Sequence, residues 1–83
     1  MNSIKSLNQF KDLIDTGYEI EFTLNDKHWL LEPAQDEPDF SPKRELACDN
    51  EVKKFNSTDE VLDYQIDNQR LADLLPKMTK VEW

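Results

Sequence analysis

The sequence contains one glycine, one cysteine and one histidine. A single glycine excludes the glycine-rich loops that cradle phosphate groups in nucleotide-binding proteins. A single cysteine excludes an internal disulfide and favours a reducing compartment, so we expect a cytoplasmic protein. With one histidine and one cysteine, a zinc site would need two further carboxylate ligands. We therefore predict no metal site and no cofactor.

Long apolar runs and clusters of basic residues are also missing. No run approaches the roughly 18 residues that a membrane-spanning helix needs, and residues 1–5 lack the layout of a signal peptide. The net charge is −8, and each of the two adjacent basic pairs has an acid nearby, Glu45 beside Lys43-Arg44 and Glu51 close to Lys53-Lys54. Direct binding to nucleic acid or to an anionic membrane needs a Lys/Arg cluster. We predict neither, and expect a protein partner with a basic surface.

The apolar residues are sufficient for one small core. The chain has 83 residues, which is the length of a single domain, 1–83. Its apolar fraction of 37% is low and its charged fraction of 34% is high. Two Trp, two Tyr and four Phe nevertheless lie in periodic segments, which argues against disorder. We expect a folded domain with a thin core and a heavily charged surface.

The first third of the chain predicts a helix and a β-hairpin. Ser6 and Gln9 have the spacing of a capping box before an apolar stripe, and Gly17 suits a C-terminal cap, so we place a helix from about residue 4 or 7 to 15. Residues 18–24 alternate between apolar and polar, and Asn25-Asp26 suits a two-residue turn. This turn predicts a hairpin over about 18–32 in which Leu24 faces Lys27, Phe22 faces Trp29 and Ile20 faces Leu31. The apolar residues of these pairs then lie on the same face of the sheet.

The rest of the chain predicts shorter elements. Residues 33–43 hold three of the four prolines and form a loop, 44–48 are a weaker strand candidate, and 49–54 are a turn or a short strand end. Ser57 begins a second capping box and a short helix. A further short helix near 70–75 ends at Pro76. The fold class is α+β, with an N-terminal helix, an antiparallel β-hairpin or meander of about three strands, two short C-terminal helices and a candidate closing strand at 79–83.

Five segments taken together form a pattern that is similar to a group of known proteins. These segments are 17–22, the hairpin with Trp29, 55–62, 66–71 and 81–83. The combined pattern resembles a diffuse group of small acidic uncharacterised proteins of Gram-positive bacteria and their phages or mobile elements. Some small acidic phage proteins of similar size act as anti-CRISPR inhibitors. The resemblance therefore implies inhibition as one option, and it transfers no functional residue to this chain.

The candidates for catalysis are few. A nucleophilic site of the Ser/His/Asp or Cys/His type would have to use His28, with Cys48 or a serine brought close by the fold. The hairpin register directs His28 to the same face as Thr23, away from the apolar side, so we interpret it as a solvated strand residue. We predict no enzyme and no catalytic residue. A small enzyme or metal binder that uses His28 and Cys48 remains an alternative.

The acidic residues give the most suggestive pattern. Residues 18–43 contain seven acids and two lysines, and 57–83 form a second acidic zone. We predict a non-catalytic protein-interaction domain whose acidic surface docks on a basic protein. The alternative is an anti-CRISPR-like inhibitor whose acidic zones mimic nucleic acid and occupy the channel of a defence nuclease. Trp83 is either a lid over the core or an exposed anchor for a partner. The predicted partner-binding residues are Glu19, Glu21, Asp36, Glu37, Asp39 and Trp83.

Overall fold

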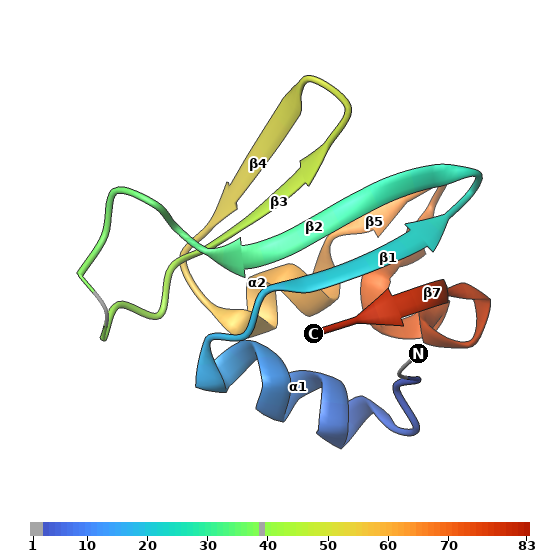
Figure 1. Ribbon diagram of the computed structural model, residues 1–83, viewed down its shortest axis with the longest axis horizontal. Helices are drawn as coiled ribbons and strands as arrows, with labels where there is room; N and C mark the ends of the chain where they lie inside the picture. The colour runs from blue at the N-terminus through green and yellow to red at the C-terminus, as the bar shows by residue number, and fades with distance from the viewer. Residues whose placement is uncertain (1–2, 39) are drawn as a thin grey trace.

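The computed structural model describes residues 3–38 and 40–83 and has an α+β fold (Figure 1). The main sheet has five antiparallel strands in the order β4-β3-β2-β1-β7, and β5 and β6 form a separate two-stranded hairpin. No helix in the described ranges is long and apolar enough to cross a membrane. The elements in chain order are α1 (Leu7–Thr16), β1 (Ile20–Leu24), β2 (Lys27–Pro33), β3 (Arg44–Cys48), β4 (Glu51–Phe55), α2 (Thr58–Asp63), β5 (Gln65–Ile66), β6 (Gln69–Arg70), the 3₁₀ helix η1 (Leu71–Lys77) and β7 (Thr79–Glu82).

Helix α1 begins and ends at its expected capping residues. The Ser6 hydroxyl accepts a hydrogen bond from the Gln9 N–H at 3.1 Å. Gly17 ends the helix with a φ of 93°, which is in the left-handed region where glycine has no Cβ to strain. The apolar stripe then lies against the sheet, with three buried residues, Phe10, Leu13 and Ile14.

The β1–β2 hairpin has the predicted register at every pair. Asn25 and Asp26 both have positive φ, 54° and 62°, as a two-residue type I′ turn requires. The aromatic rings of Phe22 and Trp29 stack with their centroids 6.4 Å apart, and the Trp29 indole donates a hydrogen bond to the Leu24 carbonyl at 3.1 Å. The facing residues are Leu24 and Lys27, Thr23 and His28, Phe22 and Trp29, Glu21 and Leu30, and Ile20 and Leu31.

The strand count differs from the prediction of about three strands. β4 is a full edge strand where we predicted a turn or a short strand end, and its first four residues are exposed. A tight turn joins β5 and β6, where Asp67 and Asn68 have φ values of 53° and 67°. η1 contains Pro76 instead of ending before it. β7 is the expected closing strand and pairs with β1.

The core lies on one side of the main sheet. α1, α2 and η1 all lie on that side (Figure 1), and their apolar residues form one buried cluster with those of the strands. The strands contribute Ile20, Phe22, Leu24, Leu31, Leu46, Phe55 and Val81, and the helical segments contribute Phe10, Leu13, Ile14, Val61, Leu62, Leu71 and Leu74. No described helix covers the opposite face.

Candidate functional site

The sheet face that points away from the helices is the candidate functional site, and we call it the open face. Its side chains alternate along each strand with those of the core. A row of directly paired residues crosses it from β7 to β4, in the order Glu82, Glu21, Leu30, Ala47 and Val52. This row is acidic at β7 and β1 and apolar at β2, β3 and β4. The other open-face side chains used below are Glu19, His28, Glu32, Glu45 and Lys54.

Five carboxylates of the open face lack a lysine or arginine partner. These are Glu19, Glu21, Glu32, Glu45 and Glu82, and none of them forms an ion pair with a lysine or arginine of residues 3–38 or 40–83. The Nε2 atom of His28 lies 3.2 Å from a carboxylate oxygen of Glu21, and both side chains are about half exposed. Glu21 also faces Glu82 on β7. The β1–β7 end of the open face is therefore strongly negative.

Glu32 is the most perturbed of these carboxylates. Burial raises its pKa above the usual 4.5, and the charges of Glu19 and Glu45 raise it further. Glu45 lies directly opposite Glu32 on β3 and is itself buried. Glu19 and Glu32 also line one side of a hollow of about 350 Å³. Three carboxylates thus converge at the end of β2 next to the loop 34–43.

The second predicted acidic zone, in residues 57–83, is different. Arg70 forms ion pairs with both Asp63 and Asp73, at 3.2 and 3.3 Å. Lys11 of α1 lies 3.9 Å from Asp59 of α2. Asp59, Asp63 and Asp73 are therefore paired with cations of the protein, whereas Glu82, which belongs to the same segment, lies on the open face and has no such cation in the described ranges.

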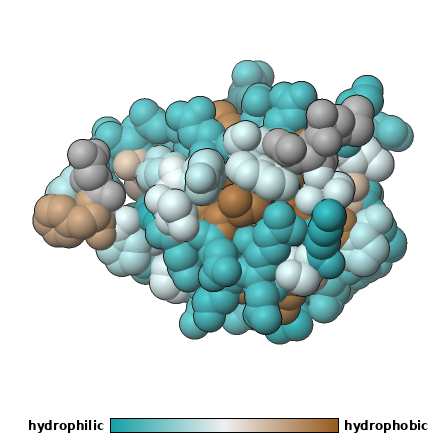
Figure 2. All heavy atoms as spheres, turned by 60° about the horizontal axis from the view of Figure 1, so that its bottom comes forward, coloured by the Kyte–Doolittle hydropathy of each residue, from teal (hydrophilic) through white to brown (hydrophobic). Residues whose placement is uncertain are grey.

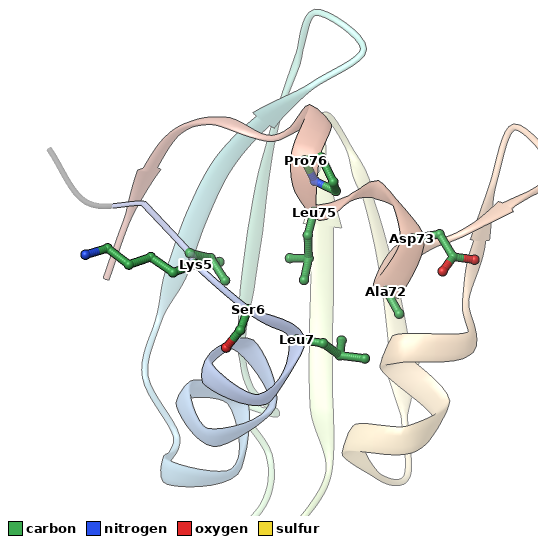
Figure 3. A pocket seen from close by; sticks show the side chains of 8 residues that line it. Lys5, Ser6, Leu7, Ala72, Asp73, Leu75 and Pro76 are labelled. Carbon is green, nitrogen blue, oxygen red and sulfur yellow. The ribbon is translucent and has the colours of Figure 1, made fainter.

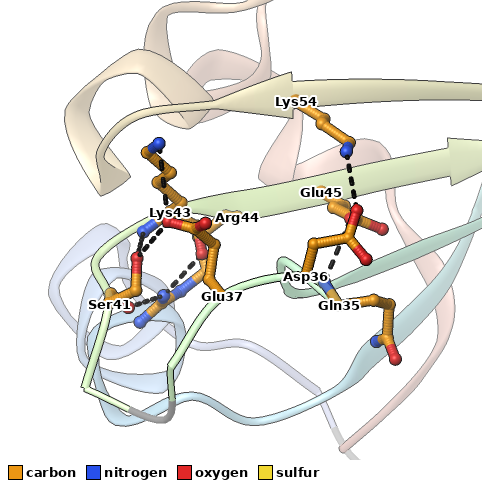
Figure 4. Close-up of polar contacts among 8 residues, drawn as sticks. All are labelled: Gln35, Asp36, Glu37, Ser41, Lys43, Arg44, Glu45 and Lys54. Carbon is orange, nitrogen blue, oxygen red and sulfur yellow. Dashed lines mark hydrogen bonds and ion pairs between the residues drawn. The ribbon is translucent and has the colours of Figure 1, made fainter.

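The predicted site residues that the structure describes separate into three groups. Glu19 and Glu21 lie on the open face, as the alternation predicted. Asp36 and Glu37 lie in the loop 34–43, where they form ion pairs with Lys54 at 3.5 Å and with Lys43 at 3.4 Å (Figure 4). Asp39 lies outside the described residues. Trp83 is partly buried and packs against the core, which matches the lid over the core that we considered for it.

Sequence reasoning missed Arg44, which ties the loop 34–43 to the helix side of the sheet. Its side chain is buried. The guanidinium donates to the carbonyls of Ser41 and Lys43, each at 2.8 Å (Figure 4). It also donates to the carbonyls of Ile14 and Asp15, at 3.0 and 3.4 Å. These two carbonyls are at the C-terminal end of α1, where a cation is favoured by the helix dipole.

The neighbouring Glu45 ties the same loop to the open face. Its side chain points the other way because adjacent residues of a strand alternate. The Glu45 carboxylate accepts the backbone N–H of Gln35 at 3.1 Å. Lys54, which faces Glu45 on β4, reaches Asp36 in the loop. The adjacent pair Arg44-Glu45 thus holds one loop from both sides of the sheet.

His28 and Cys48 do not share a site. Cys48 faces Trp29 across the β2–β3 pair, so its side chain lies on the helix side, while His28 is on the open face. Burial raises the pKa of the Cys48 thiol, and the nearby charges of Asp49 and Glu51 act in the same direction. A raised pKa disfavours the nucleophilic thiolate. Within residues 3–38 and 40–83, no three His, Cys, Asp or Glu side chains are grouped to hold a metal ion.

A hollow of about 560 Å³ lies on the helix side, between the start of α1 and η1 (Figure 3). Its lining is mostly apolar, and Figure 2 shows an apolar area on this side that hydrophilic residues surround. Ser6 lines it, but the Ser6 hydroxyl already accepts the capping hydrogen bond of α1. The lining residues are Ile4, Lys5, Ser6, Leu7, Ala72, Asp73, Leu75 and Pro76. Neither His28 nor Cys48 is among them.

Glu32→Gln is expected to stabilise the protein at pH 7. The raised pKa means that the folded state binds the Glu32 proton more tightly than the unfolded state, so wild-type stability falls as the pH rises through this pKa. Removing one of two facing like charges should raise the free energy of unfolding by about 0.2–1 kcal/mol. Urea unfolding at several pH values measures this difference, which should shrink below about pH 4.5, where Glu32 is protonated in both states. Glu51→Gln, on the exposed edge strand, is the matched control, and an equal gain from it would contradict the prediction.

Comparison with known proteins found no matching family model, no matching curated protein and no matching solved structure. The resemblance to small acidic proteins of Gram-positive bacteria and their phages therefore stays a prediction from the sequence.

Proposed function

We propose that this chain is a non-catalytic protein-interaction domain whose open face docks on a partner protein with a basic surface. The observation that carries the proposal is the uncovered sheet face with five carboxylates that have no lysine or arginine partner in the described ranges. The single cysteine favours a cytoplasmic setting for this interaction.

The arrangement of these carboxylates is costly in the free protein. Glu21 faces Glu82, and Glu32 faces Glu45. Like charges in facing positions destabilise a sheet, by about 0.2–1 kcal/mol for each pair. A domain of this size buries only about 60% of the surface of its unfolded chain, so such costs matter. Lysine and arginine side chains of a partner would supply the missing cations and relieve this repulsion.

The apolar half of the open face suits the same role. Leu30 and Ala47 are partly buried and Val52 is 57% exposed, in a continuous row beside the acidic half. Interfaces commonly combine an apolar centre with a charged rim. The charges favour encounter and selection of a basic partner, and the apolar row adds buried area.

A nucleic-acid-mimicking inhibitor is the second candidate. The observation that favours it is that the carboxylates of β1, β2 and β7 gather on one face, as negative charges do along a phosphate backbone. On this alternative the partner is a nuclease, and the protein competes with the nucleic acid for its basic channel. Competition by a DNA or RNA duplex separates the two candidates, because only the inhibitor loses its partner to the nucleic acid.

The proposal is tested with the triple variant Glu19→Gln, Glu21→Gln, Glu82→Gln. A partner captured by the wild-type chain and identified by mass spectrometry is titrated with both proteins at 50 and 300 mM salt. We expect the triple variant to bind at least tenfold more weakly at the lower salt concentration. We also expect its affinity to depend less on salt, because salt screens exposed charges.

The matched control removes the same charge elsewhere. Asp12→Asn, Glu51→Gln, Glu60→Gln changes three exposed carboxylates of α1, β4 and α2 that lie off the open face. This control should bind the partner within about twofold of wild type. Equal weakening by both triple variants would show that only the overall charge matters, and the proposal for the open face would be wrong.

A further inference from the structure

β4 forms an open edge of the main sheet. It is the outermost strand in the order β4-β3-β2-β1-β7, and its first four residues are exposed (Figure 1). Among residues 3–38 and 40–83, only β3 pairs with it. An open edge of this kind accepts a further strand through backbone hydrogen bonds.

The turn before β4 determines which of its backbone groups are free. In a hairpin with a two-residue turn, the residues that flank the turn form a hydrogen-bonded pair, and such pairs alternate along the ladder with non-hydrogen-bonded ones. The flanking residues here are Cys48 and Glu51. Val52 and Lys54 therefore direct their backbone N–H and C=O groups away from β3, toward the open edge.

The side chains at this edge carry charges of both signs. Glu51 and Lys53 point to the helix side of the sheet, and neither forms an ion pair with a residue of the described ranges. Val52 lies between them, points to the open face and is 57% exposed. An acid and a lysine two residues apart on one face are complementary to the same two residues of an identical strand that runs in the opposite direction.

We propose that β4 pairs with β4 of a second copy of this chain, antiparallel and with a twofold axis at Val52. In this register Val52 faces Val52 of the second copy as a hydrogen-bonded pair. Each Glu51 faces Lys53 of the other copy, and each Lys54 faces the neutral Asn50. A twofold axis uses the same patch on both copies, so the two Glu51–Lys53 pairs form together. Lysines generally discourage an edge from pairing with other chains, but here an acid faces Lys53.

The neighbouring registers lack this complementarity. An axis at Lys53 places the two Lys53 side chains opposite each other, and an axis at Lys54 does the same for Lys54. An axis at Glu51 places two glutamates opposite each other. Like charges in facing positions destabilise a strand pair. The charges of β4 therefore favour an identical strand in one register.

The dimer joins the two open faces. Its axis is perpendicular to the sheet, so both open faces lie on the same side and their apolar rows meet at Val52. The acidic ends at β1 and β7 lie at the two outer ends of the combined sheet. A partner with two basic patches could then be held by both copies at once. The dimer goes beyond the proposed function and does not depend on it, because the β4 pairing uses none of the open-face carboxylates.

Charge reversal at two positions tests the register. Pairing of one short strand buries less area than a standard interface, so we expect a Kd of roughly 20–200 μM for the wild-type dimer. Sedimentation velocity between about 5 μM and about 1 mM measures it. Glu51→Lys alone and Lys53→Glu alone each create facing like charges and should weaken the dimer at least tenfold. An equal mixture of these two variants should dimerise, because opposite charges then face each other in both pairs.

The double variant Glu51→Lys, Lys53→Glu removes the effect of overall charge, because its net charge equals that of the wild type. It should recover a Kd within about threefold of wild type. Asp12→Lys is the matched control for Glu51→Lys, since it makes the same charge change at an exposed position of α1. This control should leave the Kd within about threefold. Far-UV circular dichroism verifies that every variant is folded.

Three results would overturn the proposal. They are a wild-type chain that stays monomeric at about 1 mM, a double variant that dimerises no better than the single reversals, and concentration-dependent amide shifts in ¹H–¹⁵N NMR spectra that leave residues 50–54 unmoved. The partner titrations of the proposed function are run at about 5 μM, where the chain is monomeric. Failure of the dimer and failure of open-face docking are therefore observed separately.

Discussion

Arg44→Ala is expected to lower the free energy of unfolding by about 2–4 kcal/mol, because it removes charge-assisted hydrogen bonds from a buried side chain. The guanidinium is buried and donates to four backbone carbonyls, two at the end of α1 and two in the loop 34–43. Alanine removes all four of these hydrogen bonds, although the Ile14 and Lys43 carbonyls keep the backbone donors Gly17 and Ala34. It also removes the cation from the negative end of the helix dipole. A domain of this size has roughly 4–12 kcal/mol of stability in total, so the loss is a large part of it. Urea unfolding followed by far-UV circular dichroism measures the effect.

Two variants establish the cause. Arg44→Lys keeps the charge but not the planar fork of donors, so it should recover only part of the lost stability. Lys43→Ala removes an exposed neighbouring cation and should cost no more than about 0.5 kcal/mol. Full recovery with lysine would show that charge alone matters, and the role of the four carbonyl contacts would then be contradicted.

The first hairpin could be predicted to the level of single pairs because its information is local. Strict alternation over residues 18–24 determines which face of β1 is apolar. A two-residue turn then allows only one register, in which the apolar face of β2 lies beside that of β1. β4 could not be predicted in the same way. As an edge strand it is exposed at Glu51, Val52, Lys53 and Lys54, so its sequence has no alternation to detect. Lysines on such an edge discourage pairing with other chains.

The candidate site could be predicted only in part for a similar reason. The outward direction of Glu19 and Glu21 follows from the same alternation as the hairpin. The roles of Arg44 and Glu45 depend on distant parts of the chain, since Arg44 contacts the end of α1, about 30 residues away in sequence. Phe40 lies in the segment 33–43, which its three prolines predict to be a loop, and its side chain is 90% exposed.

Phe22→Ala is expected to cause the second large loss of stability, because the core lies on only one side of the sheet. Phe22 is fully buried at the centre of β1 and stacks on Trp29. Truncating a buried phenylalanine typically costs about 3–5 kcal/mol, because the lost contacts leave a cavity. Since the helices cover only one face, no second core exists in the described sheet to compensate. The variant should be largely unfolded at 37 °C, with loss of near-UV circular dichroism.

A pair of controls tests whether this loss is specific to the core. Phe22→Leu keeps most of the apolar volume and should cost about 1–1.5 kcal/mol. Val52→Ala, on the open face, should change stability by about 0.5 kcal/mol or less, because its side chain is exposed. A cost at Val52 equal to that at Phe22 would mean that the open face is covered in the free protein, and the docking surface proposed for it would then be absent.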